Sequence, residues 1–225
     1  MRLTYFGHSA FQLDDGENTV LIDPFISGND LTNQDPSALS PGSILLTHAH
    51  DDHVGDTVAI ATRCGAAVVA TFELANWAGS QGVSDVRPGN HGGTVAFPGG
   101  TAKFTPAWHT SSRSDWSAPG VPAGLVVRFG GKTIYFAGDT ALFGDMALIA
   151  DEGLDVAVLP IGDTFTMGPI DAARAVRMLR VPVVIPCHYN TFPPIRQDPE
   201  SFRTTVETDS ASRCLVLAPD ETTGF

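Results

Sequence analysis

The chain has 225 residues, 43% of them hydrophobic, and its 25 acidic residues outnumber 13 basic ones, which gives a net charge of −12. This length and apolar content suit one well-buried domain over residues 1–225. The acidic balance disfavours nucleic acid as a partner, because binding phosphates needs clustered Lys and Arg. There is no signal-peptide pattern and no run of roughly 20 apolar residues, so we expect no membrane contact and a cytoplasmic location.

Short apolar runs separated by Gly, Asp and Pro predict strands and helices in the first part of the chain. Asp14-Asp15-Gly16 is typical of a hairpin turn between two of these strands. The expected strands are residues 3–6, 10–13, 19–22, 44–46 and 66–70, and the expected helices are residues 56–63 and 73–80.

The second part repeats this alternation. Pro169 suits the first turn of a helix, and Asp171 suits its positive end. The expected strands are residues 94–97, 102–106, 124–129, 133–137, 156–160 and 183–186, and the expected helices are residues 146–150 and 169–180. Two halves of mixed strand and helix predict an α/β fold in which two mixed β-sheets pack together with helices outside.

Residues 47–53 read Thr-His-Ala-His-Asp-Asp-His and directly follow a run typical of a buried strand. Neutral imidazole and carboxylate are the ligands that borderline metals such as Zn²⁺ prefer. Three further segments after or inside strand-like runs add His109, Asp139 and His188. Together the four segments supply seven ligands, which are too many for one tetrahedral ion and suit two ions that share a bridging carboxylate and a water.

An HxHxDH run, an isolated His, a Gly-Asp after a strand and a late His, in this order and spacing, resemble the metallo-β-lactamase superfamily of hydrolases. Further segments are similar to its bacterial and archaeal branch of small metal-dependent hydrolases related to ascorbate-6-phosphate lactonase. These segments are residues 7–11 (Gly-His-Ser-Ala-Phe), 21–25 (Leu-Ile-Asp-Pro-Phe), 160–163 (Pro-Ile-Gly-Asp), 165–169 (Phe-Thr-Met-Gly-Pro) and 188–193 (His-Tyr-Asn-Thr-Phe-Pro). The resemblance implies a four-layer αβ/βα sandwich.

The same resemblance implies how the ligands are shared. The first ion takes His48, His50 and His109, the second takes Asp52, His53 and His188, and Asp139 bridges them. We expect two divalent ions, zinc first, with manganese and iron as alternatives.

Other residues are expected to support or line this site. Asp23 ends a strand, and the resemblance implies that it supports the metal-binding loop, while Thr47 is expected to hydrogen-bond that loop. Asp51 is interpreted as a loop or supporting carboxylate that points away from the ions. Because they follow ligand residues, six residues are expected to line the substrate pocket: Thr110, Ser111, Ser112, Asn190, Thr191 and Phe192.

The two remaining histidines have less defined roles. The resemblance places His8 near the mouth of the site, where it either contacts substrate or is simply packed, whereas His91 lies in a turn sequence and is expected to face solvent. Cys187 adjoins a ligand, but neighbours in a strand face opposite sides, so we expect a packed core thiol. Trp77, Trp108 and Trp116 are expected to pack in the core or at the rim of the site.

These patterns predict a dinuclear metal-dependent hydrolase that activates a water to attack a small-molecule ester, lactone, amide or phosphoester. In this hypothesis Asp52 orients the attacking water, and His8 donates a proton to the leaving group. Two alternatives stay open: a nuclease or phosphodiesterase of the same superfamily, and a metal-binding or di-iron protein without hydrolysis. Oligomerisation with other copies of the chain also stays open.

Overall fold

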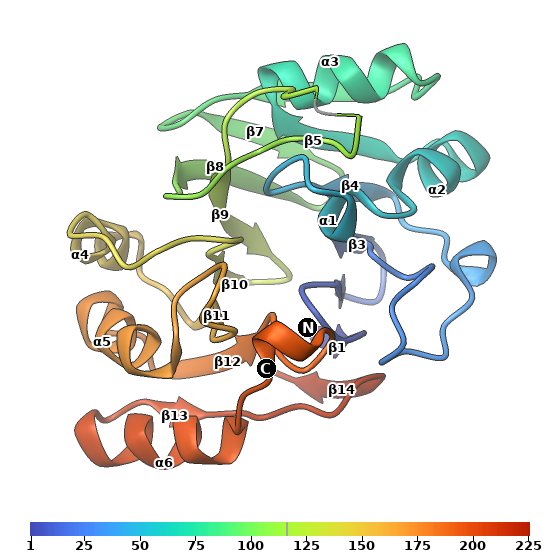
Figure 1. Cartoon of the computed structure of the whole chain (residues 1–225). Coiled ribbons are helices and arrows are strands. Elements are labelled where there is room, and N and C mark those ends of the chain that lie inside the picture. The colour runs from blue at the N-terminus through green and yellow to red at the C-terminus, as the bar shows by residue number, and fades with distance from the viewer. Residues whose placement is uncertain (116) are drawn as a thin grey trace.

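The computed structural model describes residues 1–115 and 117–225 and contains two packed β-sheets with helices on their outer faces (Figure 1). The first sheet comprises β1 (Arg2–Tyr5), β2 (Phe11–Asp14), β3 (Thr19–Ile22), β4 (Ser43–Leu45), β5 (Ala67–Thr71), β6 (Val86–Gly89) and β14 (Glu221–Gly224). The second comprises β7 (Thr94–Phe97), β8 (Gly100–Pro106), β9 (Ala123–Phe129), β10 (Lys132–Phe136), β11 (Val156–Pro160), β12 (Val183–Cys187) and β13 (Arg213–Cys214).

Both sheets are mixed. The first has the order β14-β1-β2-β3-β4-β5-β6, antiparallel from β14 to β3 and parallel from β3 to β6. The second has the order β13-β12-β11-β10-β9-β8-β7, antiparallel from β7 to β10 and parallel from β10 to β13. The predicted sandwich of two mixed sheets is confirmed.

Helices cover the outer face of each sheet (Figure 1). The first sheet carries α1 (Asp51–Val54), α2 (Thr57–Cys64) and α3 (Phe72–Ser80), and the second carries α4 (Met146–Ile149), α5 (Pro169–Leu179) and α6 (Pro199–Asp209). Short 3₁₀ helices are η1 (Pro36–Ala38), η2 (Ala150–Glu152) and η3 (Pro193–Ile195). Among the described helices, none has the length and apolar character needed to cross a membrane.

Three hydrophobic clusters hold these layers together. The central cluster lies between the sheets and includes Phe11, Phe104 and Phe136. A second cluster packs α4, α5 and α6 on the second sheet, and a third packs α2 and α3 on the first. The four layers follow from this burial, because each sheet has one apolar face toward its partner sheet and one toward helices.

Five of the described helices and strands were not predicted: β6, β13, β14, α1 and α6. The strands lie at sheet edges, and β14 has the polar sequence Glu-Thr-Thr-Gly, which lacks the apolar alternation of a half-buried strand. For α6 a signal was present. Asp198 caps the helix through its side chain, Pro199 occupies its first turn, and Phe202 and Val206 form its buried face.

Candidate metal centre

Two groups of metal-ligating side chains meet at one edge of the sandwich. Within each group, one donor atom of every residue lies within 4.8 Å of the others. The first group is His48, His50, His109 and Asp139, and the second is His8, Asp52, His53 and His188. The structure thus brings together all seven residues expected as ligands and adds His8 to them.

Asp139 lies between the two groups. Its Oδ1 atom is 3.2 Å from Nε2 of His53, and its Oδ2 atom is 3.0 Å from Nε2 of His188. The same Oδ2 atom lies 3.5 Å from Nε2 of His109 and 4.0 Å from Nε2 of His48. One carboxylate therefore faces imidazoles of both groups.

The ends of strands in the second sheet place three of these residues. His109 follows β8, Asp139 follows β10, and His188 directly follows β12. Gly138 precedes Asp139 with φ +62°, and a Cβ atom there would lie 2.8 Å from Cβ of Thr47. Only glycine permits the end of β10 to approach so closely the ligand loop, residues 47–53, which follows β4 of the other sheet.

The HxHxDH segment runs from the end of β4 into α1. His48 and His50 precede the helix, and the backbone around Ala49 is held by the opposite loop. The Ala49 N–H donates to Oγ of Ser111 at 3.1 Å, and Arg113 donates to the Ala49 carbonyl at 3.3 Å. These bonds fix the extended stretch from which both imidazoles project.

Asp51 and Asp52 point in different directions from the first turn of α1. Asp51 is exposed and forms an ion pair with Arg113 at a distance of 2.7 Å. The guanidinium of Arg113 also lies over the ring of Trp77. Asp52 faces the centre, where its Oδ2 atom lies 3.1 Å from Nε2 of His8. The structure therefore places Asp51 outside the ligand groups, as its position in the sequence indicated.

Asp23 orients two of the ligand imidazoles. Its carboxylate accepts hydrogen bonds from the Thr47 N–H (2.9 Å), the Thr47 hydroxyl (2.6 Å) and Nδ1 of His53 (2.7 Å). The Thr47 oxygen in turn accepts from Nδ1 of His48 at 3.1 Å. Both rings thus carry their proton on Nδ1 and present Nε2 to the centre, which is how outer carboxylates support metal ligands.

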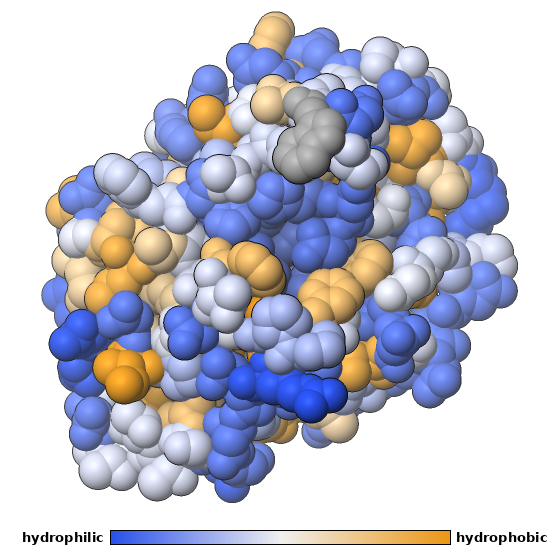
Figure 2. Space-filling view, in the orientation of Figure 1, coloured by the Kyte–Doolittle hydropathy of each residue, from blue (hydrophilic) through white to orange (hydrophobic). Residues whose placement is uncertain are grey.

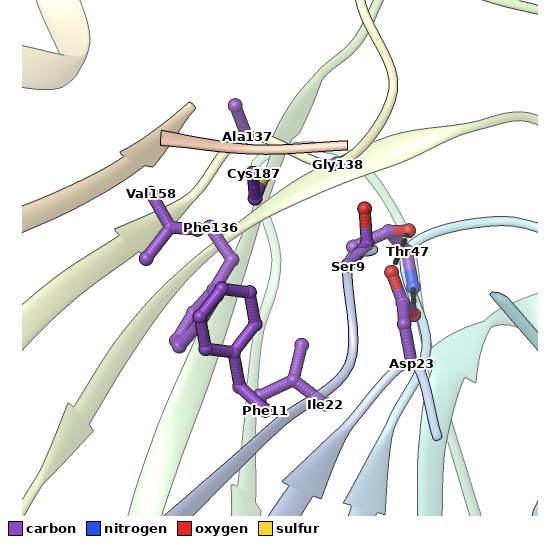
Figure 3. A pocket seen from close by; sticks show the side chains of 10 residues that line it. All are labelled: Ser9, Phe11, Ile22, Asp23, Thr47, Phe136, Ala137, Gly138, Val158 and Cys187. Carbon is purple, nitrogen blue, oxygen red and sulfur yellow. Dashed lines mark hydrogen bonds between the residues drawn. The ribbon is translucent and has the colours of Figure 1, made fainter. Parts of the chain in front are cut away.

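A small internal cavity lies beside this network (Figure 3). Ser9, Asp23 and Thr47 line one side, whereas Phe11 and Phe136 close the other (Figure 3). Its volume of about 10 Å³ leaves room for no more than about one water molecule. The hydrogen bonds of Asp23 are therefore shielded from bulk solvent.

His8 is fully buried and has a protein partner at each ring nitrogen. Nε2 lies 3.1 Å from Oδ2 of Asp52, and Nδ1 lies 2.9 Å from Oγ1 of Thr191. Its backbone has φ +55°, and its carbonyl accepts from the His188 N–H at 2.7 Å. This differs from the expected contact with substrate, because the ring faces Asp52 and does not line the pocket described below.

Burial lowers the pKa values of histidines in the centre, whereas neighbouring carboxylates raise them. Burial lowers the pKa of His48 well below its usual range and that of His8 to about 4. Burial acts in the same direction on His53, but the carboxylates of Asp139 and Asp23 outweigh it and raise its pKa well above 6.5.

The two carboxylates of the centre are held in the ionised form. Burial favours the neutral acid, but the imidazoles of His188 and His53 outweigh it and lower the pKa of Asp139. Burial likewise opposes the ionisation of Asp52, whose pKa is lowered by the hydrogen bond from His8 and by the nearby His53. Ionised carboxylates are the form that binds a cation.

Among the described residues, two buried atoms that face each other in the middle of the centre have no hydrogen-bond partner: Nε2 of His53 and Oδ1 of Asp139. Buried polar atoms are nearly always satisfied, so each such exception needs an explanation. Here the two atoms converge, and imidazole nitrogen with carboxylate oxygen is a donor set that suits a borderline divalent cation. The residues present therefore fit a bound metal.

A pocket of about 250 Å³ opens over the centre. Ligand residues form its floor, and Thr110, Phe165 and Phe192 form its walls. Thr110 and Phe192 were expected in the pocket and line it, whereas four other expected residues are not among the described residues that line it: Ser111, Ser112, Asn190 and Thr191.

Internal hydrogen bonds occupy three of these four side chains. Ser111 holds the ligand loop, Thr191 holds His8, and Asn190 accepts from the Gln197 N–H. Phe165, which replaces them in the pocket, stands in a short loop between β11 and α5. A large apolar residue in a Gly- and Pro-containing loop after a strand is a signal that could have identified it.

The remaining sequence expectations concern residues outside the centre. His91 is exposed and donates to the Pro122 carbonyl at 2.8 Å. Cys187 is buried, and burial raises the pKa of its thiol. Trp77, on α3, is partly buried against the third hydrophobic cluster, whereas Trp108 is largely exposed. Trp116 lies outside the described residues.

The fold and the centre define a metal-dependent hydrolase with the metallo-β-lactamase fold. A family model described as beta-lactamase superfamily domain matches residues 18–189. A UPF0173 metal-dependent hydrolase of Thermus thermophilus is 53% identical over 202 residues, covering 90% of this chain and 89% of its own. One from Deinococcus radiodurans is 46% identical over 226 residues, covering 99% of both.

A solved structure agrees with these relatives. Igni18, a metallo hydrolase from the archaeon Ignicoccus hospitalis, superimposes with a TM-score of 0.90 at 37% identity, over 100% of this chain and 98% of Igni18. The chain belongs to the UPF0173 metal-dependent hydrolases of the metallo-β-lactamase superfamily.

Proposed function

We propose that this protein is a dinuclear hydrolase of small molecules, with Asp139 as the carboxylate shared by two divalent cations. The observation that carries this proposal is the position of Asp139 between two groups of ligand donors. His48, His50 and His109 hold the first cation, and Asp52, His53 and His188 hold the second. The prevalence of imidazole favours zinc, while manganese and iron suit the same donors.

Two bound cations would lower the pKa of a shared water and polarise the oxygen of an ester, lactone, amide or phosphoester. The protein supplies the rest of the arrangement. Asp23 and Thr47 fix the ligand rings, and the pocket over the centre holds the substrate beside them. Asp52, at the pocket floor, accepts a hydrogen bond from the attacking water and directs it.

His8 acts on this arrangement through Asp52. A pKa of about 4 keeps its imidazole neutral at pH 7, so that Nε2–H donates to the Asp52 carboxylate while Nδ1 accepts from Thr191. A neutral imidazole is too weak an acid to protonate a leaving group. We therefore assign His8 to positioning Asp52 in place of the proton donation expected from the sequence.

Metal analysis tests the proposal. Protein purified in the presence of zinc should contain two ions per chain, and Asp139→Ala should lose both the ions and the hydrolysis of ester, lactone and phosphoester substrates. One ion per chain in fully loaded, active protein would overturn the dinuclear assignment. Activity that requires iron and oxygen would favour the di-iron alternative.

A further inference from the structure

The walls and the floor of the pocket over the metal centre differ in polarity. The floor consists of polar ligand residues, whereas two of the three wall residues are the aromatic side chains Phe165 and Phe192. They are 56% and 37% exposed. Figure 2 shows hydrophobic side chains on either side of a depression near the middle of this face, below a band of hydrophilic ones.

The backbone holds both rings in place at this opening. Thr164 and Asp163, just before Phe165, have positive φ values of +25° and +62°. The Thr164 hydroxyl donates to the Pro194 carbonyl at 3.0 Å, which joins the Phe165 loop to the loop that carries Phe192. Non-glycine residues with positive φ cluster at functional sites, where the surrounding structure maintains the strain.

Phe192 is also fixed from below, because its ring lies edge-on to the ring of His8 with centroids 5.5 Å apart. Large apolar side chains exposed together beside a cleft indicate a binding surface. The two rings therefore form an apolar binding surface above the ligand residues, and the backbone already holds it in place before a substrate binds.

Apart from the metal centre itself, the described lining of the pocket carries no cationic side chain that could pair with a charged substrate group. None of its described lining residues is Lys or Arg. Arg113, in the loop that follows His109, is engaged by Asp51, by the Ala49 carbonyl and by the ring of Trp77. Arg196, at the end of η3, is exposed and is not among the lining residues.

We propose that the site takes small substrates that carry an apolar or aromatic group beside the scissile bond, held between Phe165 and Phe192, and no charged group away from that bond. This inference rests on the proposed function. The size of the pocket agrees with it, because about 250 Å³ lies below the roughly 300–1,000 Å³ of sites for drug-sized ligands. A phosphate or sulfonate remote from the scissile bond would lose its hydration without gaining a partner.

Two esters with closely similar leaving groups test this: 4-ethylphenyl acetate and 4-(2-sulfoethyl)phenyl acetate. Zinc-loaded protein should hydrolyse the neutral ester with a kcat/KM at least about tenfold higher. Phe165→Ala and Phe192→Ala should each raise KM for the neutral ester roughly tenfold with kcat within about twofold, because they remove apolar contact made equally in the ground and transition states. Leu148→Ala on α4, a large exposed residue outside the pocket, is the matched control and should change neither constant.

Equal or better hydrolysis of the sulfonated ester would overturn the inference, as would an unchanged KM in both Phe variants. A loss confined to the sulfonated ester in Arg196→Ala would show that an anion is recognised at the mouth, and would overturn it as well. Calorimetry that measures the binding of 4-ethylphenol and 4-(2-sulfoethyl)phenol to the same variants distinguishes a failure of the apolar pocket from a failure of the proposed hydrolysis. Preferential, Phe-dependent binding without turnover would support the apolar pocket and count against the proposed hydrolysis.

Discussion

The Nδ1 atom of His53 lies 2.7 Å from Oδ2 of Asp23, while the Nε2 atom of the same ring lies 3.2 Å from Oδ1 of Asp139. The ring is buried and stands between two carboxylates from different sheets. Because one nitrogen is committed to Asp23, the other is left with its lone pair toward the centre when a metal binds. The orientation of this ligand thus depends on a residue that does not touch the metal.

Asp23→Asn should lower the affinity for zinc by about 10- to 100-fold, since the amide is a weaker acceptor for His53 and for the hydroxyl of Thr47. Titration against a chromophoric chelator measures this. Asp85→Asn, which alters a surface pair with Arg87, is the control and should leave the affinity unchanged. Wild-type affinity in a folded Asp23→Asn protein would contradict the role of Asp23.

His8→Asn should reduce kcat roughly 10- to 100-fold while leaving the metal content at the wild-type level, because Asn tolerates the positive φ but is too short to hold Asp52. Metal analysis and the split between kcat and KM are the measurements. Thr191→Val removes only the bond to Nδ1 and should have the same effect in milder form. Loss of a metal ion from His8→Asn would instead make His8 a ligand.

Zinc binding near neutral pH should release about one proton per chain from the ligand groups whose pKa is shifted. The raised pKa of His53 means that its ring is protonated in the metal-free protein and must give up that proton to bind. His48 is already neutral, and Asp52 and Asp139 are already ionised. Apparent affinity should therefore fall as the pH is lowered.

Calorimetry in two buffers of different ionisation enthalpy counts these released protons. His53→Asn, which lacks the titrating ring, is the comparison and should show smaller release. Binding enthalpies that are independent of the buffer in the wild-type protein would contradict the prediction.

We also expect no measurable binding of RNA or DNA at physiological salt. The densest basic group of the sequence, on α5, is engaged by carboxylates: Arg174 with Asp171, Arg177 with Asp209, and Arg180 with Asp151. Counterion release requires free Lys and Arg, and the net charge of −12 opposes it. Tight, strongly salt-dependent retention of a labelled oligonucleotide in a filter assay would favour the nuclease alternative.

The layered fold was predictable because its inner strands are apolar and regularly spaced. β4, β5 and β11 are buried on both sides and stand out as short apolar runs. The edge strands β6 and β14 were not predictable in this way, since their pairing depends on neighbours distant in sequence. The antiparallel partner of β14, for instance, is β1 at the other end of the chain.

The ligand residues were predictable because donor chemistry and spacing in the sequence already define them. The roles of the residues around the ligands were not predictable in this way. Ser111 and Thr191 were expected in the pocket from their places beside His109 and His188, but their hydroxyls are used for internal hydrogen bonds. Which way a short polar side chain points depends on three-dimensional neighbours, and here those are Ala49 and His8.

The position of the centre between the sheets has a mechanical consequence. The segment with His48 and His53 belongs to the first sheet, whereas His109, Asp139 and His188 belong to the second. A metal bound by both sets is a cross-link between two layers that otherwise adhere through apolar side chains. Separating the layers at this edge would first have to break coordination bonds. Amide hydrogen exchange should accordingly slow in β4 and β10 together when the metal is added, although neither strand supplies a ligand.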